Sequence, residues 1–391
     1  MEKIPITRPL FDQEEEKSIL ESLRSGWVVQ GPKVAEFERL FAEYTGAKHA
    51  IATTSCTTAL HLALIAAGVN AGDEVIVPAF TWIATANVVE YVGAKPIFCD
   101  IDLATYNIDV EQIETKITEK TKAIIPVHLF GLCADMDPIM ELARRHDLQV
   151  VEDAACALGA WYGDRHAGTF GTAGCFSFHP RKAITTGEGG ILITDDDEVA
   201  GLCRALRDHG ASVSDLARHE GKRAFLLTEF NVLGFNYRMT DIQGAMAVAQ
   251  MGKLKSILEA RSARAERYNG MLEDAELIQL PAVPEGCAHG YQSYVCLLQA
   301  EQPDLDNVVE LHEKRNQLME NLEDQGISTR QGTHSVHMLG YYRIKYGMEE
   351  SDFPRSFSAD KLTLTLPLYP QMTDAEQERV VQSLKRELED L

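Results

Sequence analysis

The stretch C-F-S-F-H-P-R-K-A-I-T-T-G-E-G-G spans residues 175–190 and is the most informative part of the chain. Its apolar start predicts a short strand that presents Ser177, and Pro180 marks a bend directly after it. Lys182 then stands before a glycine-rich turn. A lysine is usually a solvated surface charge, but its amine can form a Schiff base with a carbonyl where its surroundings lower its pKa. The stretch alone leaves both interpretations of Lys182 open.

Around this stretch, apolar runs alternate with helical patterns. The predicted strands lie near 49–53, 74–78, 95–99, 122–127, 148–152, 174–178 and 190–194. The helical patterns lie near 33–44, 57–67, 83–92, 109–117 and 136–147. Several runs, such as Val75-Ile76-Val77, are apolar throughout, as is typical of strands covered on both faces. The alternation predicts an α/β fold, with a mostly parallel, seven-stranded sheet and helices on both of its faces.

The pattern changes after about residue 250, where a long helical stretch leads into a segment with fewer strands. Two more helices are expected near 306–325 and 373–390, the second of them capped by Thr373. We therefore expect a large domain at residues 1–250, which includes an N-terminal arm, and a smaller α+β domain at residues 251–391.

The composition argues against several classes of protein. With 37 basic and 59 acidic residues the net charge is −22, which repels nucleic-acid phosphates, so we expect no nucleic-acid binding. The eight cysteines form no C-x-x-C and no zinc-like spacing. We therefore expect no metal site, and free thiols favour a cytoplasmic location. The sequence has neither the apolar core of a signal peptide nor a membrane-spanning run of about 18 apolar residues.

Polar or aromatic residues follow several predicted strands, where open α/β sheets bind their ligands. Cys56 and Thr57 open the helix after the first strand, as an anion site or as an ordinary helix start. Trp82 follows the second strand, where it can stack on a planar ring or simply belong to the core. Glu152-Asp153 ends the fifth strand, and a buried carboxylate there needs a positive partner, either a protonated ring nitrogen or, as the alternative, a structural ion pair.

With Lys182, this set matches the needs of pyridoxal phosphate. That cofactor requires a lysine for its aldehyde, a carboxylate for its pyridinium nitrogen, an aromatic side chain on its ring face and a cradle for its phosphate. A coincidence of all four, in this order and at strand ends, is improbable.

At this point the sequence resembles the sugar aminotransferases of the DegT/DnrJ/EryC1/StrS family, which have fold type I of the pyridoxal-phosphate enzymes. The resemblance covers nearly the whole chain, and its two most specific motifs are F-S-F-H-P-R-K-A-I-T-T-G-E-G-G and L-G-F-N-Y-R-M-T-D-I-Q-G-A at 233–245. Further motifs are S-G-W-V-V-Q-G-P at 25–32, F-E-R-L-F-A-E-Y-T-G at 37–46, G-D-E-V-I-V-P-A-F-T-W at 72–82, V-E-D-A-A at 151–155 and L-P-L-Y-P-Q-M-T at 366–373.

The resemblance implies a role for each matching position. Lys182 would form the internal aldimine and then move the proton between substrate and cofactor. Asp153 would keep the pyridine nitrogen protonated, and Trp82 would stack on the ring. The residues implied to hold the phosphate are Cys56, Thr57, Ser177 and, from the neighbouring subunit, Asn236. A contact from the neighbouring subunit implies a homodimer with shared active sites.

Two positions depart from the commonest family pattern. Cys56 replaces a glycine, which matters little if the contact is made by the backbone amide. Cys156 replaces a glutamine beside the cofactor, which puts in doubt a side-chain contact to the ring. Lys182 itself is intact, whereas a branch of the family that dehydrates sugars has histidine there, so transamination is favoured.

The resemblance further implies the substrates, a nucleotide-linked keto-sugar, expected to be a 4-keto-6-deoxyhexose, and glutamate. Glutamate would convert the cofactor to its pyridoxamine form, and the keto-sugar would then take the amino group. The candidates for substrate contacts are Arg181, Glu188, Arg238, Arg330 and His337. His337 ends T-H-S-V-H at 333–337, which is similar to a substrate loop of the family, although an exposed loop histidine is the alternative.

Three other functions are weighed against this one. Another fold type I enzyme, such as a lyase, a dehydratase or a cysteine desulfurase, would leave the motif at 233–245 unexplained. A non-catalytic regulatory protein that binds the cofactor would not need both Lys182 and Asp153. A nicotinamide dehydrogenase would need G-x-G-x-x-G after the first strand, where the chain has T-S-C-T-T-A.

Overall fold

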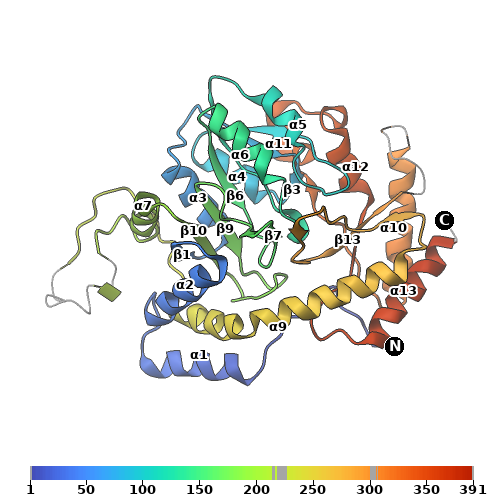
Figure 1. The fold of residues 1–391 in the computed structure, drawn as a ribbon, viewed down its shortest axis with the longest axis horizontal. Helices are drawn as coiled ribbons and strands as arrows, with labels where there is room; N and C mark the ends of the chain where they lie inside the picture. Colours follow the sequence, from blue (N-terminus) through green and yellow to red (C-terminus); the bar gives the residue numbers. More distant parts are fainter. Residues whose placement is uncertain (1, 214–215, 218–226, 300–304, 306, 390–391) are drawn as a thin grey trace.

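A computed structural model describes residues 2–213, 216–217, 227–299, 305 and 307–389. Its main sheet has seven strands (Figure 1). They are β1 (His49–Thr53), β2 (Glu74–Pro78), β4 (Lys95–Cys99), β5 (Thr121–Ile124), β6 (Gln149–Asp153), β9 (Ala173–Ser177) and β10 (Gly190–Thr194). The spatial order is β1-β10-β9-β6-β5-β2-β4, and β10 alone runs antiparallel to its two neighbours. The predicted mostly parallel, seven-stranded sheet is therefore confirmed.

Helices cover both faces of this sheet, because successive strand residues point to opposite sides. In β2, Ile76 packs with one group of helices, and Val75 and Val77 pack with the other. The first group contains α2 (Pro32–Thr45), α6 (Met136–Arg145) and the start of α9 (Asp241–Leu272). The second group contains α3 (Cys56–Ala66), α4 (Ala84–Tyr91) and α7 (Asp197–Arg207). This arrangement confirms an α/β sheet that is buried on both faces.

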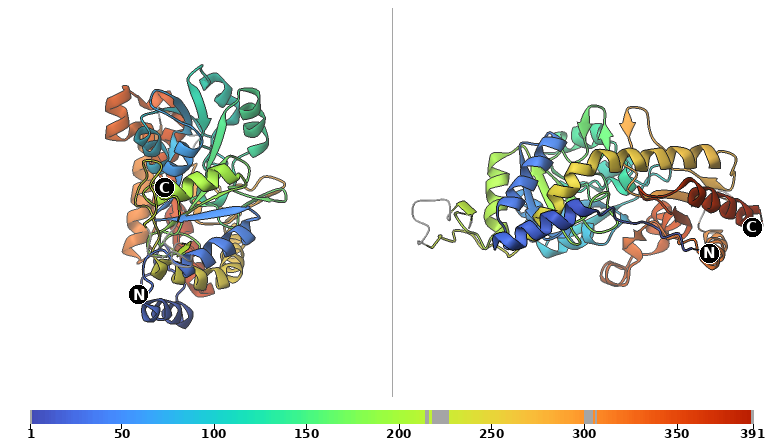
Figure 2. Two further views of the ribbon diagram at one scale, coloured as in Figure 1. Left: turned by 90° about the vertical axis from the view of Figure 1, so that its left-hand side faces the viewer. Right: turned by 90° about the horizontal axis from the view of Figure 1, so that it is seen from below.

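A second, antiparallel sheet follows the 32-residue helix α9, which extends from one sheet to the other (Figures 1 and 2). Its strands are β11 (Ile278–Gln279), β13 (Tyr294–Leu298) and β15 (Thr363–Leu366). The helices around it are α10 (Val308–Asp324), α12 (Pro354–Leu362) and α13 (Asp374–Glu389). Both predicted C-terminal helices are present, and Thr373 accepts a hydrogen bond from the amide of Glu376 at the start of α13. The division into two domains at residue 250 stays a prediction.

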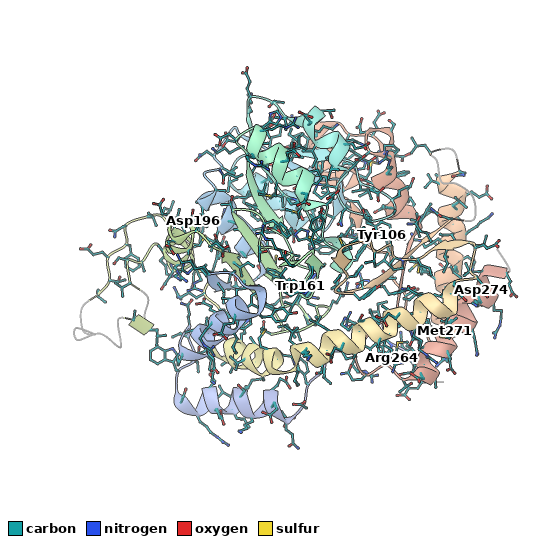
Figure 3. All side chains as sticks on the ribbon, in the orientation of Figure 1. Tyr106, Trp161, Asp196, Arg264, Met271 and Asp274 are labelled. Carbon is teal, nitrogen blue, oxygen red and sulfur yellow. The ribbon has the colours of Figure 1, made fainter. Side chains whose placement is uncertain are left out.

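Side-chain ion pairs join α9, and the residues just after it, to α13. Figure 3 labels Arg264, Met271 and Asp274 along α9 and just beyond its end. Arg264 pairs with Asp374 at the start of α13, and Asp274 pairs with Lys385 near its end. Met271 packs against the apolar core between the second sheet and these helices.

Shorter elements complete the described chain. They are α1 (Gln13–Ser25), β3 (Phe80–Thr81), α5 (Val110–Ile113), η1 (Glu114–Lys116), η2 (Leu129–Gly131), β7 (Trp161–Tyr162), β8 (Arg165–His166), β12 (Cys287–Ala288), β14 (His334–Ser335), η3 (Val336–Met338), α11 (Gly340–Tyr346) and η4 (Glu350–Asp352). Among the described helices, none combines the length and the apolar character that crossing a bilayer would require.

Candidate active site

Asp153 is the last residue of β6 and lies at the carboxyl edge of the sheet, with 5% of its surface exposed. Its Oδ2 accepts a hydrogen bond of 2.8 Å from the hydroxyl of Thr85, and its Oδ1 accepts one of 3.2 Å from the amide of Ala155. Burial raises the pKa of Asp153 above its ordinary value, although these hydrogen bonds and the charge of Lys182 oppose the shift. The carboxylate is therefore buried and oriented, and a cation beside it would be strongly attracted.

Lys182 lies in the turn between β9 and β10, where its amide donates to the carbonyl of His179. Its Nζ lies 3.1 Å from Sγ of Cys156, three residues beyond Asp153. Burial disfavours the ammonium form, but the contact with Cys156 and the charge of Asp153 outweigh it, so the pKa of Lys182 is raised. The amine and the carboxylate, which the sequence predicted as two residues of one site, thus act on one another.

The start of α3 lies beside this pair. Ser55 caps the helix by accepting the amide of Thr58, while first-turn amides such as those of Cys56 and Thr57 have no intrahelical acceptor. Gly190 makes the approach possible, because a Cβ on it would lie 2.2 Å from the carbonyl carbon of Ser55. Such a helix start is suited to an anion.

Ser177 lies at the same end of the sheet. It is the last residue of β9 and is directly opposite Gly190 on β10. The charges of Asp153 and Lys182 also act on the thiol of Cys56, whose pKa burial raises well above its ordinary value. An amine, a carboxylate, a hydroxyl and a helix start therefore share one edge of the sheet, and this set fits the aldehyde, ring nitrogen and phosphate of pyridoxal phosphate.

Trp82 follows β3, with 58% of its surface exposed. Strand β3 pairs with β14, and this pairing brings the ring of His334 to 5.7 Å from the ring of Trp82. The predicted loop T-H-S-V-H therefore lies against the strand that carries Trp82. Nothing in the sequence indicated that His334 would lie beside Trp82, because the two paired strands are some 250 residues apart in the chain.

His337 is fully buried in η3, so it is not the exposed loop histidine considered as the alternative. Its Nδ1 lies 3.1 Å from the hydroxyl of Ser335, and its ring packs against the ring of Phe353. Its Nε2 has no hydrogen-bond partner among the described residues. Burial lowers the pKa of His337 to about 4.

The other predicted residues lie at the surface or near it. Four of them are exposed to solvent: Arg181, Glu188, Asn236 and Arg330. Arg238 is half-buried, and its guanidinium pairs with the carboxylate of Asp208. Its charge is therefore already partly neutralised within the chain.

Glu152, the neighbour of Asp153, faces the other side of the sheet. Its carboxylate accepts hydrogen bonds from His128 Nε2 at 2.8 Å and from the amides of Gly168, Phe170 and Gly171 at 2.7 Å each. The structural ion pair that the sequence allowed for this dipeptide thus belongs to Glu152. Asp153 is the member that points to the predicted site.

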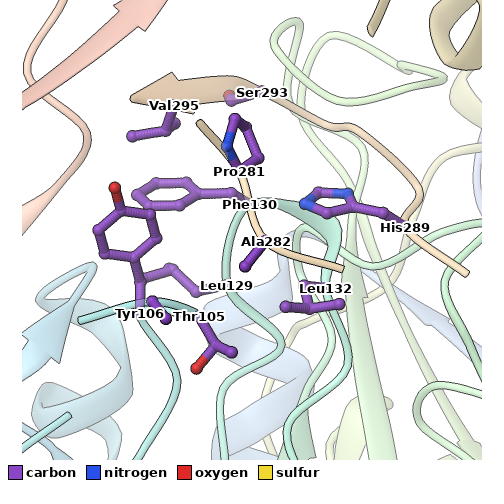
Figure 4. A pocket seen from close by; sticks show the side chains of 11 residues that line it. Thr105, Tyr106, Leu129, Phe130, Leu132, Pro281, Ala282, His289, Ser293 and Val295 are labelled. Carbon is purple, nitrogen blue, oxygen red and sulfur yellow. The ribbon is translucent and has the colours of Figure 1, made fainter. Parts of the chain in front are cut away.

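A separate hollow lies between Tyr106, Phe130, His289 and Val295 (Figure 4). Its volume is about 10 Å³, so it can hold at most a water molecule. None of the predicted site residues lines it. The carboxyl edge of the main sheet therefore remains the candidate active site.

Comparisons with known proteins agree with this arrangement. Residues 9–385 match the DegT/DnrJ/EryC1/StrS aminotransferase family. The chain is 38% identical to the GDP-perosamine synthase of Caulobacter vibrioides, over 99% of this chain and 98% of that protein. Among solved structures, the PMP form of Spr1654 of Streptococcus pneumoniae superposes with a TM-score of 0.90 at 28% identity, with 99% of each chain covered.

PseC of Helicobacter pylori, an aminotransferase involved in the biosynthesis of pseudoaminic acid, also superposes with a TM-score of 0.90, at 26% identity and over 100% of both chains. The match to the family spans nearly the whole chain, and the fold and the edge of the sheet agree with it. The chain therefore belongs to the DegT/DnrJ/EryC1/StrS aminotransferase family and is a pyridoxal-phosphate-dependent transaminase with the type I fold.

Proposed function

We propose that this enzyme transfers an amino group from glutamate to a nucleotide-linked keto-sugar, specifically a 4-keto-6-deoxyhexose. The observation that carries the proposal is the placement of Lys182 and Asp153 beside the start of α3. Relatives named for perosamine and pseudoaminic acid biosynthesis support a sugar as the acceptor.

The proposed roles follow from the chemistry of the side chains. Pyridoxal phosphate, when bound, supplies an aldehyde that condenses with amines and a ring that withdraws electrons. Asp153 would hold a proton on the ring nitrogen by its buried negative charge. Nζ of Lys182 would bind the cofactor and then move a proton at the substrate carbon. Trp82 would cover the ring.

The phosphate would lie at the start of α3. The free amides of Cys56 and Thr57 in the first turn would donate to its oxygens, and so would the hydroxyl of Ser177 at the end of β9. The positive end of the helix dipole favours the same site. Gly190 serves this role indirectly, since it lets the helix start approach the sheet.

The substrate diphosphate needs positive charge on a chain with a net charge of −22. Arg181, next to Lys182, and Arg330 are exposed and are the preferred candidates. Arg238 is less suitable because Asp208 already pairs with it. Glu188 and His337 remain weaker candidates for sugar contacts, since Glu188 carries a negative charge like the substrate and the side chain of His337 is fully buried.

The active form is proposed to be a homodimer. Asn236 is exposed on the segment between α7 and α9, whose described ends project from the body of the molecule (Figure 1). Leu227 and Leu233 in this segment are each 90% exposed, and Phe230 is 60% exposed. A second copy would bury these apolar side chains and bring Asn236 to its neighbour's cofactor phosphate.

A cytoplasmic location is also proposed, as all eight cysteines are free thiols.

Spectroscopy and peptide mapping test the cofactor site. The protein reconstituted with pyridoxal phosphate should be yellow, and borohydride should bleach it and attach the pyridoxyl group to Lys182. The Lys182→Ala variant should show neither effect. A wild-type protein that stays colourless, or a label on another lysine, would overturn the proposed site.

The substrate is tested with a panel of nucleotide-linked keto-sugars, with glutamate as donor and aspartate as a matched control. Amination of a 4-keto-6-deoxyhexose, detected by mass spectrometry, is the expected result. Amination of a 3-keto-sugar alone, or turnover with aspartate but not glutamate, would refute the corresponding half of the proposal.

A further inference from the structure

His334 lies on β14, the short strand from the C-terminal part of the chain that pairs with β3. In this register His334 is directly opposite Thr81, and Ser335 is directly opposite Phe80. Side chains that are directly opposite one another in an antiparallel pair lie on the same face, with their Cβ atoms about 5 Å apart. His334 therefore shares one face of this small sheet with Thr81.

The face that carries Thr81 is turned towards the buried carboxylate of Asp153. The hydroxyls of Thr81 and Thr85 lie 3.0 Å apart, and the hydroxyl of Thr85 donates to Oδ2 of Asp153 at 2.8 Å. Phe80, in contrast, packs into the apolar core around the second sheet. The pairing of β14 with β3 thus brings His334 to the rim of the site that would hold the cofactor ring.

The imidazole of His334 is accessible to a ligand. Its side chain is 42% exposed, and its ring lies 5.7 Å from the ring of Trp82. Among the residues that the structure describes, the imidazole makes no hydrogen bond, since Oδ1 of Asp360 lies 4.0 Å from its Nδ1. Asp360 instead holds the loop, because its Oδ1 accepts the amide of Ser335 at 3.0 Å and Nε2 of Gln331 at 2.8 Å. The histidine therefore stands on a fixed loop with its ring nitrogens available.

We propose that His334 donates or accepts a hydrogen bond at a ring hydroxyl of the keto-sugar and is a specificity-determining residue for that substrate. The inference rests on the proposed function, in which Trp82 covers the cofactor ring. A hydroxyl and a neutral imidazole each offer a donor and an acceptor, and the ring of Trp82 adds apolar surface beside them. A carboxylate of glutamate at the same place would meet the like charge of Asp360.

The test measures the two half-reactions separately, from the absorbance of the cofactor. In His334→Ala, kcat/KM for the keto-sugar should fall about tenfold, as for the loss of one hydrogen bond, while kcat/KM for glutamate should change less than twofold. His334→Gln keeps a donor and an acceptor and should regain most of the loss. His334→Phe keeps an aromatic ring but should behave as His334→Ala.

Binding is measured independently by calorimetric titration with the nucleotide-linked hexose that carries a hydroxyl in place of the keto group. The dissociation constant should rise about tenfold in His334→Ala and in His334→Phe, but little in His334→Gln. A purely structural role of the histidine would not give this rescue by an amide.

The control variant is His146→Ala. His146 is also a partly exposed histidine beside a carboxylate, with its Nε2 3.4 Å from Oε1 of Glu114, but it follows α6 at the opposite edge of the main sheet. Both half-reactions should be unchanged in this variant. Equal losses in the two half-reactions of His334→Ala, or no loss with the keto-sugar, would overturn the inference. A wild type that aminates no keto-sugar would overturn the proposed function instead.

Discussion

Thr85 controls the orientation of the carboxylate on which the candidate site depends. Its hydroxyl donates to Asp153 at 2.8 Å, and the hydroxyl of Thr81 lies 3.0 Å behind it. All three side chains are buried, so their hydrogen bonds form away from competing water. Thr85 is thus a positioning residue for Asp153.

We expect Thr85→Val to weaken the binding of pyridoxal phosphate about tenfold, since a hydrogen bond to a charged group contributes about 1.5 kcal/mol. Thr85→Ser retains the hydroxyl and should bind nearly as the wild type does. Fluorescence titration of the cofactor-free proteins measures both constants. Equal losses in the two variants would assign the effect to packing of the methyl group.

The adjacent Glu152 has a structural role, which predicts a different result. In Glu152→Gln an NH₂ group faces backbone amides that need an acceptor, so the free energy of unfolding should fall by about 3 kcal/mol. Denaturant unfolding measures this, with Glu119→Gln as an exposed control expected to change stability by less than about 0.5 kcal/mol. A Glu152→Gln variant as stable as this control would contradict the role.

At the residue scale, side chains at the ends of strands could be predicted from the sequence. Side chains that reach the site only because two distant strands pair could not. Lys182 and Asp153 follow recognisable strands, so their neighbourhood was predictable. Thr85 lies inside a helix pattern, where a threonine has no distinguishing signal. His334 depends on the pairing of β14 with β3, which no local pattern encodes.

The elements meet at Gly190, where β10 and the start of α3 are in close contact. We expect Gly190→Ala to move the helix start away, lowering the free energy of unfolding by about 2 kcal/mol and weakening cofactor binding. Gly201→Ala is the matched control, because nothing lies within 4 Å of a Cβ at that position in α7. It should be neutral or slightly stabilising. Unfolding and cofactor titration measure both variants, and unchanged binding in Gly190→Ala would refute the close-contact argument.

The bounds of the strands and helices show which features of the sequence were sufficient to predict secondary structure. The seven strands lie within a few residues of their predicted positions, because buried strands are short apolar runs with clear ends. The helix expected at 109–117 is instead a single α-helical turn, α5, continued by the 3₁₀ turn η1. The antiparallel direction of β10 was not predicted in particular, since hydrophobic pattern carries no information on direction.

For the whole molecule, buried histidines predict sensitivity to acid. His166 is 1% exposed, and its Nε2 accepts the amide of Gly159 while its Nδ1 donates to the carbonyl of Ala167. Burial lowers its pKa to about 4, as it does for His337. The unfolded chain binds protons at about pH 6.5, so stability is lost as the pH falls from 6.5 towards 4.

Each of these two histidines should lower the free energy of unfolding by up to about 1.4 kcal/mol per pH unit within that window. Denaturant unfolding at pH 7, 6 and 5 measures the slope. His166→Gln should be less stable at pH 7 but less dependent on pH. A variant with the same slope as the wild type would show that His166 does not contribute.

The proposed shared active site gives a prediction at the scale of the assembly. Lys182→Ala and Asn236→Ala should each be inactive, but mixing them with subunit exchange should restore activity. Half of a random mixture is the mixed dimer, which has one intact site in two, so about one quarter of wild-type activity is expected. An inactive mixture with verified exchange would count against a site completed by both subunits.

The position of β10 has a consequence for the newly made chain on the ribosome. Strand β1 is at the edge of the sheet, and its sheet partner is β10, some 140 residues later. The first strand of the sheet to be synthesised therefore cannot pair until β10 has been made. It stays unpaired while the strands in the middle of the sheet pair with one another. Helix α3 follows directly after β1, so the proposed phosphate site cannot form before that late closure. Loading of the cofactor would then mark the moment at which the sheet is complete.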